Sequence, residues 1–251
     1  MKKIKRLSLV IALILVANIK VFAEGGFEFA VNVPIGASFG MPSGFEPSYT
    51  FITGSKSTIT TEAGFDSGVQ VQIGYMFTFG GFGLSLLGDL GYSFDSYRYS
   101  DYLNSEYRDI YGNSTKIEYK QTISMYMHNF QIGILPKFNF GNFAWGIGGG
   151  VKIPMAGTIE NTTKDSLNGN YTRKIDYKSS YFELPVIGYF KMTFDYSFFF
   201  NDSMAFVLGA YLGADIGPIW KQGQLTSDKD PSISSFDIGV NLGFKFGPRL
   251  N

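Results

Sequence analysis

Along most of the chain, hydrophobic and polar residues alternate with a period of two. In the first such stretch, residues 27–39, every second side chain is apolar, beginning with Phe27, Phe29 and Val31. This alternation is typical of a β-strand with one apolar face and one polar face. Eight stretches share the pattern, and the sequence therefore predicts eight strands. They cover residues 27–39, 68–77, 82–94, 130–140, 143–153, 182–194, 205–216 and 236–246.

The length of the predicted strands separates two all-β folds that both show alternation. A secreted β-sandwich and a transmembrane β-barrel each have one apolar face. At about 3.3 Å per residue and a tilt of about 40°, strands of this length span the apolar band of about 25 Å of a transmembrane barrel. Strands of ordinary globular sheets are about half as long. Strand length therefore favours the barrel.

Short and long connections alternate between the predicted strands. Short ones fall at residues 78–81, 141–142 and 195–203, whereas long polar ones fall at about 40–65, 95–121, 156–180 and 217–235. Long loops without periodicity are uncommon in compact soluble domains. Short turns on one side and long loops on the other are typical of outer-membrane barrels. We therefore predict an all-β fold, an eight-stranded antiparallel up-and-down transmembrane β-barrel with four long extracellular loops.

Aromatic residues support a membrane location. The chain has 25 Phe and 16 Tyr, and many of them gather where the short turns are predicted, for example Phe79, Phe82 and Phe140. Aromatic side chains of this kind form girdles at membrane interfaces. The apolar faces of the eight stretches carry no charged residue.

The first 23 residues have the pattern of a secretory signal peptide. Basic residues from Lys2 to Arg6 precede an apolar run at 7–17, and small residues lead to Ala23. The run is shorter than the roughly 20 residues that a membrane-spanning helix needs. We expect cleavage after Ala23 and a barrel formed by residues 24–251. Five of the 21 basic residues and none of the 21 acidic ones would be removed, which leaves 16 against 21, a net charge of −5. This balance does not favour nucleic-acid binding.

Few residues offer catalytic or metal-binding chemistry. The chain has no cysteine and a single histidine, His128, so disulfides, thiolate sites and histidine-rich metal sites are excluded, and no cofactor is expected. His128 could act as the general base of an outer-membrane lipid-modifying enzyme, with Ser124 nearby. The His–Ser spacing of lipid deacylases is not reproduced around it, so we do not expect an enzyme and keep this function as a minor alternative.

Residues 27–246 as a whole resemble the small outer-membrane barrels of the OmpA transmembrane-domain, OmpX and OmpW type. The resemblance lies in strand number, aromatic girdles, loop asymmetry and a last strand that ends at Phe246. It implies a bacterial outer-membrane protein that meets outer-membrane lipids and the outer-membrane assembly machinery during biogenesis. We expect a monomer. Five residues follow Phe246, whereas the family's assembly signal usually ends on the aromatic residue.

Charged residues fall on the faces predicted to point into the barrel. Eight-stranded barrels have interiors just wide enough to be filled by side chains. Because charges in such a space persist only when paired, we predict an ion-pair network that plugs the lumen. A charged conduit is the alternative. The predicted network consists of Glu28, Asp89, Lys137, Lys152, Glu183, Lys191, Asp215, Asp237 and Lys245.

The second predicted loop is rich in tyrosine and arginine, which are enriched at binding hot spots. Host or envelope components are candidate partners for such a patch. The alternative is ordinary packing of tyrosines across strands that continue beyond the membrane. The candidate patch consists of Tyr97, Arg98, Tyr99, Tyr102, Tyr107, Arg108 and Tyr111, with Trp220 from the fourth loop.

Two functions follow from these features. The first is a surface-exposed structural or interaction (adhesin-like) protein with a plugged lumen. The second is an OmpW-like conduit for small apolar molecules, which needs an apolar pocket in the loop-side half of the barrel. Charged residues predicted for that half, such as Asp215 and Asp237, favour the first function.

Overall fold

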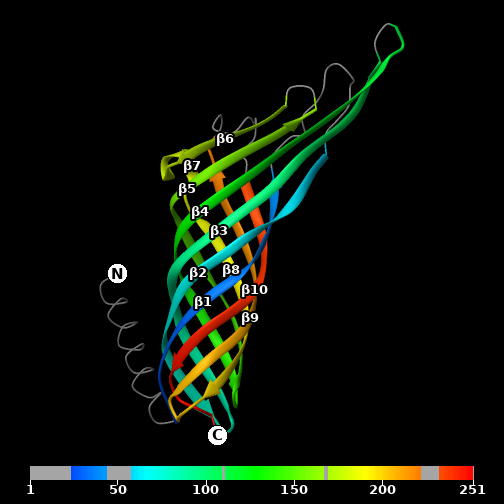
Figure 1. Cartoon of the computed structure of the whole chain (residues 1–251). Helices are drawn as coiled ribbons and strands as arrows, with labels where there is room; N and C mark the ends of the chain where they lie inside the picture. The colour runs from blue at the N-terminus through cyan, green and yellow to red at the C-terminus, as the bar shows by residue number, and fades with distance from the viewer. Residues whose placement is uncertain (1–23, 44–57, 109–110, 167–168, 222–231, 251) are drawn as a thin grey trace.

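Eight antiparallel strands close into a ring in the computed structural model, which describes residues 24–43, 58–108, 111–166, 169–221 and 232–250. The order of pairing is β10-β1-β2-β3-β4-β5-β8-β9, and β9 pairs back with β10 (Figure 1). The predicted eight-stranded antiparallel barrel is confirmed. The ring strands are β1 (Glu24–Ser43), β2 (Thr58–Phe79), β3 (Phe82–Arg108), β4 (Ser114–Phe140), β5 (Phe143–Asp165), β8 (Ile187–Phe199), β9 (Met204–Trp220) and β10 (Ser232–Phe246).

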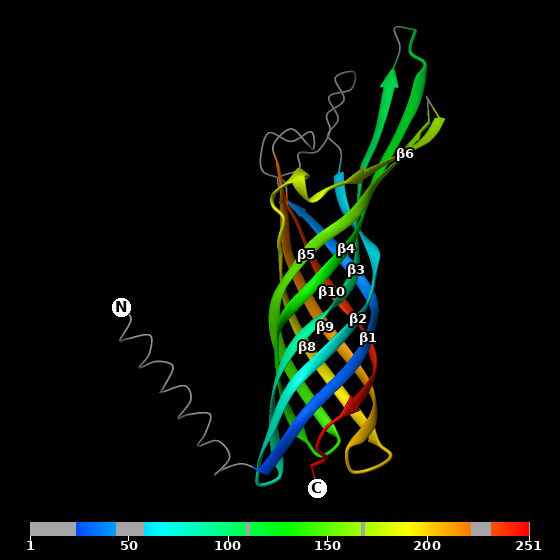
Figure 2. The same ribbon diagram turned by 90° about the vertical axis from the view of Figure 1, so that its left-hand side faces the viewer.

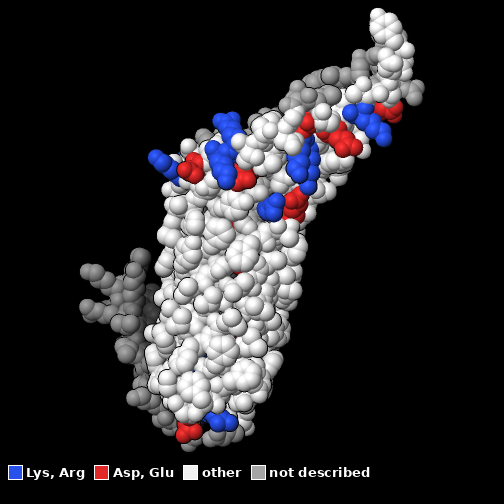
Figure 3. Space-filling view, in the orientation of Figure 1, with Lys and Arg blue, Asp and Glu red and all other residues white. Residues whose placement is uncertain are grey.

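The wall of the barrel is apolar outside and polar inside. On β3, Leu86 and Leu90 are exposed on the outer surface, whereas Ser85 and Asp89 are buried inside. In Figure 3, charged side chains gather at the two ends of the molecule and the wall between them is almost free of them. At about 3.3 Å per residue and a tilt of about 40°, the stretch from Phe82 to Phe94 rises about 30 Å, enough to cross the apolar core of a membrane.

Tight turns close one end of the barrel. Phe140 pairs with Phe143, which leaves a two-residue turn at Gly141 and Asn142. Gly141 has a φ of 58°, in the left-handed region that such turns require and that glycine adopts without strain. Phe79 and Phe82 flank the turn between β2 and β3, and their rings stack at 5.3 Å.

Aromatic girdles mark both edges of the apolar band. Near the tight turns, Phe138 stacks on Trp145 at 5.7 Å. At the opposite edge, Phe94 lies 6.3 Å from Tyr126 and 5.3 Å from His128, measured between ring centroids. Rings at both interfaces are typical of transmembrane barrels.

Beyond the second girdle, strands replace most of the predicted loops. β3 continues to Arg108 and β4 begins at Ser114, so the loop predicted at 95–121 is largely a β-hairpin. β6 (Gly169–Tyr177) pairs with β5 within the loop predicted at 156–180. Together, residues 58–62, 96–108, 114–126, 157–165 and 169–177 form a five-stranded sheet, here called the extension (Figure 2). The predicted loops at 40–65 and 217–235 are shortened too, because β1 reaches Ser43, β2 begins at Thr58, β9 reaches Trp220 and β10 begins at Ser232.

The strand predicted at 182–194 is broken. Residues 179–181 form a short 3₁₀ helix, β7 (Phe182–Leu184) pairs with β9, and β8 begins only at Ile187. Pro185 lies at the break, and proline has no N–H to donate to the ladder. As a result Phe182 turns inward and Glu183, predicted in the lumen, is exposed.

Two predictions concern residues outside this description. The predicted signal peptide at 1–23 lies outside the described residues, as do the remaining parts of the predicted loops. Among the described helices, none has the length and apolarity to cross a membrane.

Candidate functional site

Ion pairs fill the lumen from the tight turns to the mouth. Eight of the nine residues predicted there are buried inside the barrel, Glu183 being the exception. The inward positions of β3 mark successive levels: Ser85, Asp89, Asp95 and Tyr97, from the tight turns upward.

The lowest level holds two ion pairs. Lys245 Nζ lies 3.0 Å from Glu28 Oε1, and Lys137 Nζ lies 2.8 Å from Asp195 Oδ2. Ser85 donates a hydrogen bond to Glu28 and accepts one of 2.9 Å from Asn139. The Lys245–Glu28 pair joins the neighbouring strands β10 and β1, whereas the Lys137–Asp195 pair joins β4 to β8 past β5.

Asp89 is the centre of the middle level. Its Oδ2 atom lies 2.7 Å from Lys191 Nζ and accepts hydrogen bonds from Gln131 at 2.7 Å and Tyr189 at 3.1 Å. From β8, the Tyr189 side chain reaches past β5 to Gly133 of β4, where any Cβ atom would collide with the tyrosine hydroxyl. Glycine at position 133 is therefore what lets Tyr189 reach Asp89.

Lys152 is the centre of the upper level. Its Nζ atom lies 2.6 Å from Asp215 Oδ2 and 2.9 Å from Asp95 Oδ1. Asp95 also accepts hydrogen bonds from Ser93, at 2.8 Å, and from Asn129. Both carboxylates are almost completely buried, so each depends on the lysine and on these donors for its stability.

Only small spaces remain between these levels. A cavity of about 50 Å³ borders Asp66, Asp95, Lys152, Asp215 and Asp237. One oxygen each of Asp66 and Asp237 has no hydrogen-bond partner in the protein. The cavity is large enough for a few water molecules, which would satisfy these oxygens. A second cavity, at the lowest level, measures about 10 Å³.

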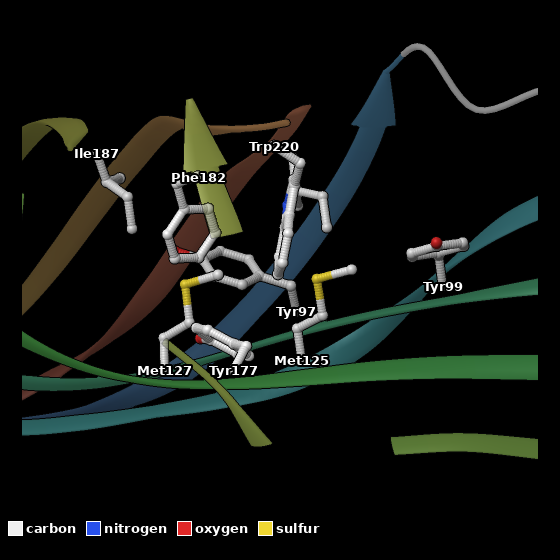
Figure 4. Packing of buried hydrophobic residues seen from close by; sticks show 9 residues of the cluster. Tyr97, Tyr99, Met125, Met127, Tyr177, Phe182, Ile187 and Trp220 are labelled. Carbon is white, nitrogen blue, oxygen red and sulfur yellow. The ribbon is translucent and has the colours of Figure 1, made fainter. Parts of the chain in front are cut away.

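Above the polar levels, an apolar cluster fills the mouth of the barrel. Trp220 and Phe182 pack with ring centroids 4.4 Å apart, and Tyr177 meets both rings edge to face at 5.4 and 5.3 Å. In Figure 4, Met125 and Met127 approach this aromatic group from β4. We call this group the mouth cluster. Its buried members are Tyr97, Tyr99, Met125, Met127, Tyr177, Phe182, Ile187, Trp220 and Ile233.

Tyr97 connects the mouth cluster to the polar network. Its ring belongs to the cluster, and its hydroxyl donates a hydrogen bond of 3.1 Å to Asp215. The side chain is completely buried. An apolar layer therefore rests directly on the charged one, and the two are held together by one tyrosine.

The candidate loop patch is divided between the two faces of the extension. Tyr97, Tyr99 and Trp220 are buried in the mouth cluster, so these three residues are not available at the surface. Arg98 and Tyr102 point to the outer face, and Tyr111 is 84 % exposed near the tip of the hairpin. The side chains of Tyr107 and Arg108 lie outside the described residues. The division follows from the strand period of two, which sends neighbouring residues to opposite faces.

Three lumen acids were missed in the sequence, although a signal for them existed. Asp66, Asp95 and Asp195 lie just past the ends of three predicted stretches. Each continues the inward phase of its strand, for example from Asp89 through Ser93 to Asp95. Extending the period by one or two residues would have found them.

His128 lies on the outer surface at the upper girdle. Its Nδ1 atom is 2.6 Å from the Tyr92 hydroxyl, within hydrogen-bond distance, and its ring packs against Phe94. Its described neighbours are therefore aromatic and do not form a Ser–His–acid arrangement. Within the described part of the chain, no group of three or more His, Asp or Glu side chains is arranged to hold a metal ion.

The chain is similar to known proteins in its three-dimensional structure but not in its sequence. No protein-family model matches the chain, and no curated protein matches its sequence. Similar structures include Ail, the attachment invasion locus protein of Yersinia pestis, at 12 % identity over 86 % of this chain and 98 % of that one, with a TM-score of 0.30. They also include the outer membrane protein OprG from Pseudomonas aeruginosa, at 12 % identity over 90 % and 97 %, with a TM-score of 0.32.

Neisserial surface protein A is a third similar structure, at 10 % identity over 87 % of this chain and 98 % of that one, with a TM-score of 0.23. These scores are too low to carry an argument about function. Assignment as an eight-stranded barrel rests on the closed ring of strand pairs in the chain itself.

Proposed function

We propose that the chain is an integral protein of the bacterial outer membrane, with a plugged barrel that serves as an anchor and an extension that serves as an interaction surface. The observation that carries this proposal is the stacking of three charged levels and the mouth cluster along a single lumen. Each level contains ion pairs between strands that are not neighbours in the ring, for example between Lys191 on β8 and Asp89 on β3.

The energetics of the lumen favour a plug over a conduit. The paired lysines and carboxylates retain less than a tenth of their side-chain exposure, for example 9 % for Lys191 and 0 % for Asp89. A solute passing through would have to separate such pairs, and breaking a buried pair costs about 3–5 kcal/mol. Three successive levels would have to open for one passage.

The extension supplies a rigid surface outside the membrane. Its strands are paired continuously with the barrel wall, as in the unbroken pairing of β3 with β4 from Gly83 to Arg108. Residues at its far end are exposed, with Tyr111 as the most exposed large hydrophobic side chain among those described. Host or envelope components that bind there would be held at a fixed distance from the membrane.

Conduction of small apolar molecules is the second candidate function. It requires an apolar pocket in the loop-side half of the barrel. That region is apolar, as a conduit requires, but it is filled by Met127, Phe182 and Trp220, whose side chains are at most 2 % exposed. An apolar solute would have to displace these side chains.

Shortening the hairpin tests the interaction function. Asp101 and Gln121 are paired, so residues 101–121 can be replaced by an Asn-Gly turn without a change in the register below. We expect cells that display the full chain to adhere to host extracellular-matrix components or to each other, and cells with the shortened chain to lose this adhesion while the barrel stays folded. Equal adhesion of both, and of cells lacking the protein, would overturn the proposal.

A further inference from the structure

The outer face of the extension is a direct continuation of the membrane-facing wall. On β4, outward residues run from Phe130 and His128 through Tyr126 to Ser124 and on to Lys120. Along β4, the outer face thus changes within a few residues from lipid-facing aromatic side chains to polar and basic ones. No turn or crossing strand separates the two parts in the described chain.

A groove lies in this surface just above the upper girdle. Its volume is about 250 Å³, and Tyr126 of the girdle forms part of its lining. Hydroxyl groups line its floor, from Thr122, Ser124 and Thr162. A second hollow of about 340 Å³ adjoins it and shares Lys120 and Lys164.

Basic side chains outnumber acidic ones in the lining of the groove. Arg98, Lys120 and Lys164 face Glu62 and Glu160. Glu160 is paired with Lys174, from outside the lining, at 2.8 Å. The lining of the groove therefore holds one more positive than negative charge, and Lys174 adds a cation beside Glu160.

Glu62 also holds two of the cations in the groove. Glu62 contacts Lys120 at 2.6 Å and Arg98 at 3.5 Å, and both basic side chains remain about 40 % exposed. Hydrogen bonding from Lys120 and Ser100 lowers the pKa of Glu62, so the carboxylate remains charged and keeps both cations in place. An anion that enters the groove would meet guanidinium and ammonium groups that are already positioned, beside hydroxyl donors.

The height of the groove matches the layer of lipid headgroups. Arg98 lies four residues beyond Phe94, which is about 10 Å of height at the usual rise and tilt. Headgroup layers extend about 5–8 Å beyond the apolar core, and long basic side chains reach several ångströms toward them. The extension leans away from the barrel in both ribbon views (Figures 1 and 2), and basic and acidic side chains are interspersed over the face seen in Figure 3.

We propose that this groove binds the phosphorylated headgroups of lipids in the surrounding leaflet, with phosphate on Arg98 and Lys164 and headgroup hydroxyls on the Thr and Ser floor. The lipid is favoured over a soluble anion because the groove opens onto the surface that lipid chains already cover. Binding of this kind does not depend on the interaction function proposed above.

Lipid retention measured by native mass spectrometry tests the proposal on the full chain in detergent. The probes are a lipid whose sugar headgroup carries phosphates, its dephosphorylated form, and the soluble sugar phosphate. The test variant is Arg98→Ala/Lys164→Ala. The matched control is Lys116→Ala/Lys221→Ala, which removes the same charge from exposed positions outside the groove.

We expect the wild-type chain and the control to bind the phosphorylated lipid with equal affinity. The test variant should bind it about 25-fold more weakly, since each basic residue near an anionic surface contributes about a factor of five. Arg98→Lys should restore part of the affinity lost in Arg98→Ala. Dephosphorylation should lower binding to the wild type by a similar factor, and the soluble sugar phosphate should bind far more weakly than the lipid.

Three outcomes would overturn the proposal. The control could lose as much affinity as the test variant, which would indicate nonspecific attraction. Dephosphorylation could leave binding unchanged, or the soluble sugar phosphate could bind as tightly as the lipid. Heat-modifiable mobility on gels verifies that each variant is folded.

Discussion

Lys152 Nζ lies 2.6 Å from Asp215 Oδ2 and so links β5 to β9 across the lumen. The two strands are separated in the ring by β8. The same ammonium group reaches Asp95 on β3 at 2.9 Å. One side chain therefore joins three strands that share no backbone hydrogen bonds with one another, and it does so directly below the mouth cluster.

Replacement of Lys152 by methionine should destabilise the barrel strongly. Methionine retains much of the side-chain volume but leaves Asp95 and Asp215 buried without their cation, which costs about 3–5 kcal/mol. Urea unfolding of the protein in lipid vesicles measures this loss. Lys174→Met removes an exposed partner of Glu160 and should leave the unfolding midpoint unchanged. Similar midpoints for both variants would show that the lumen pair is not important for stability.

Tyr97→Phe should weaken the junction between the charged level and the mouth cluster. The ring is kept, and only the hydroxyl that donates to Asp215 is lost, so we expect a cost of about 1–2 kcal/mol. Tyr97→Ala also leaves a cavity in the cluster and should cost about 3–5 kcal/mol. Unfolding in vesicles gives both values, and equal values for the two variants would contradict the dual role of this tyrosine.

An arginine in the middle of the outer wall should be poorly tolerated. Ile134 is 68 % exposed and lies about midway between the girdles on β4. Ile134→Arg should cost about 2–4 kcal/mol, as for arginine at the midplane of transmembrane barrels. Ile175 is also exposed but lies on β6, outside the membrane.

Ile175→Arg is the matched control and should be close to wild type in unfolding experiments. If both arginine variants were equally stable, the proposed position of the membrane on the barrel would have to be abandoned.

The extension should loosen at acidic pH. Hydrogen bonds from Lys120 and Ser100 lower the pKa of Glu62 below its usual value of 4.5. A lowered pKa in the folded state gives stability that is fully present above about pH 4.5 and is lost as the pH falls through the lowered value. Limited proteolysis by an acid-active protease should show faster cleavage of residues 58–62 below pH 4.5.

Glu62→Gln should remove that pH dependence, because glutamine does not titrate. Its cleavage rate should already be raised at neutral pH. An identical pH profile for wild type and Glu62→Gln would rule out Glu62 as the titrating group.

The barrel could be predicted from the sequence because each strand within the membrane has a strict chemical contrast between its faces. Lipid requires apolar residues outside, and the lumen of a narrow barrel holds polar ones, so the alternation of Leu86 and Leu90 with Ser85 and Asp89 is visible directly. Because of this contrast, eight of the nine predicted lumen residues could be assigned to the inward face, where they are buried.

The extension could not be recognised in the same way. Above the membrane, water replaces lipid on the outer face, so Arg98 and Tyr102 outside alternate with Tyr97 and Tyr99 inside, and the period is hidden. Two tyrosines of the predicted surface patch, Tyr97 and Tyr99, are therefore buried in the mouth cluster above the lumen. Glu183 is exposed and not in the lumen because the strand is interrupted at Pro185 and Val186, so the alternation of β8 does not continue into β7.

Conductance of the wild-type protein in planar lipid bilayers tests the plugged barrel most directly. With three charged levels and the mouth cluster in place, we predict no stable channel at neutral pH and moderate voltage, from preparations verified as folded by heat-modifiable mobility. A large and stable single-channel conductance from the same preparation would contradict it.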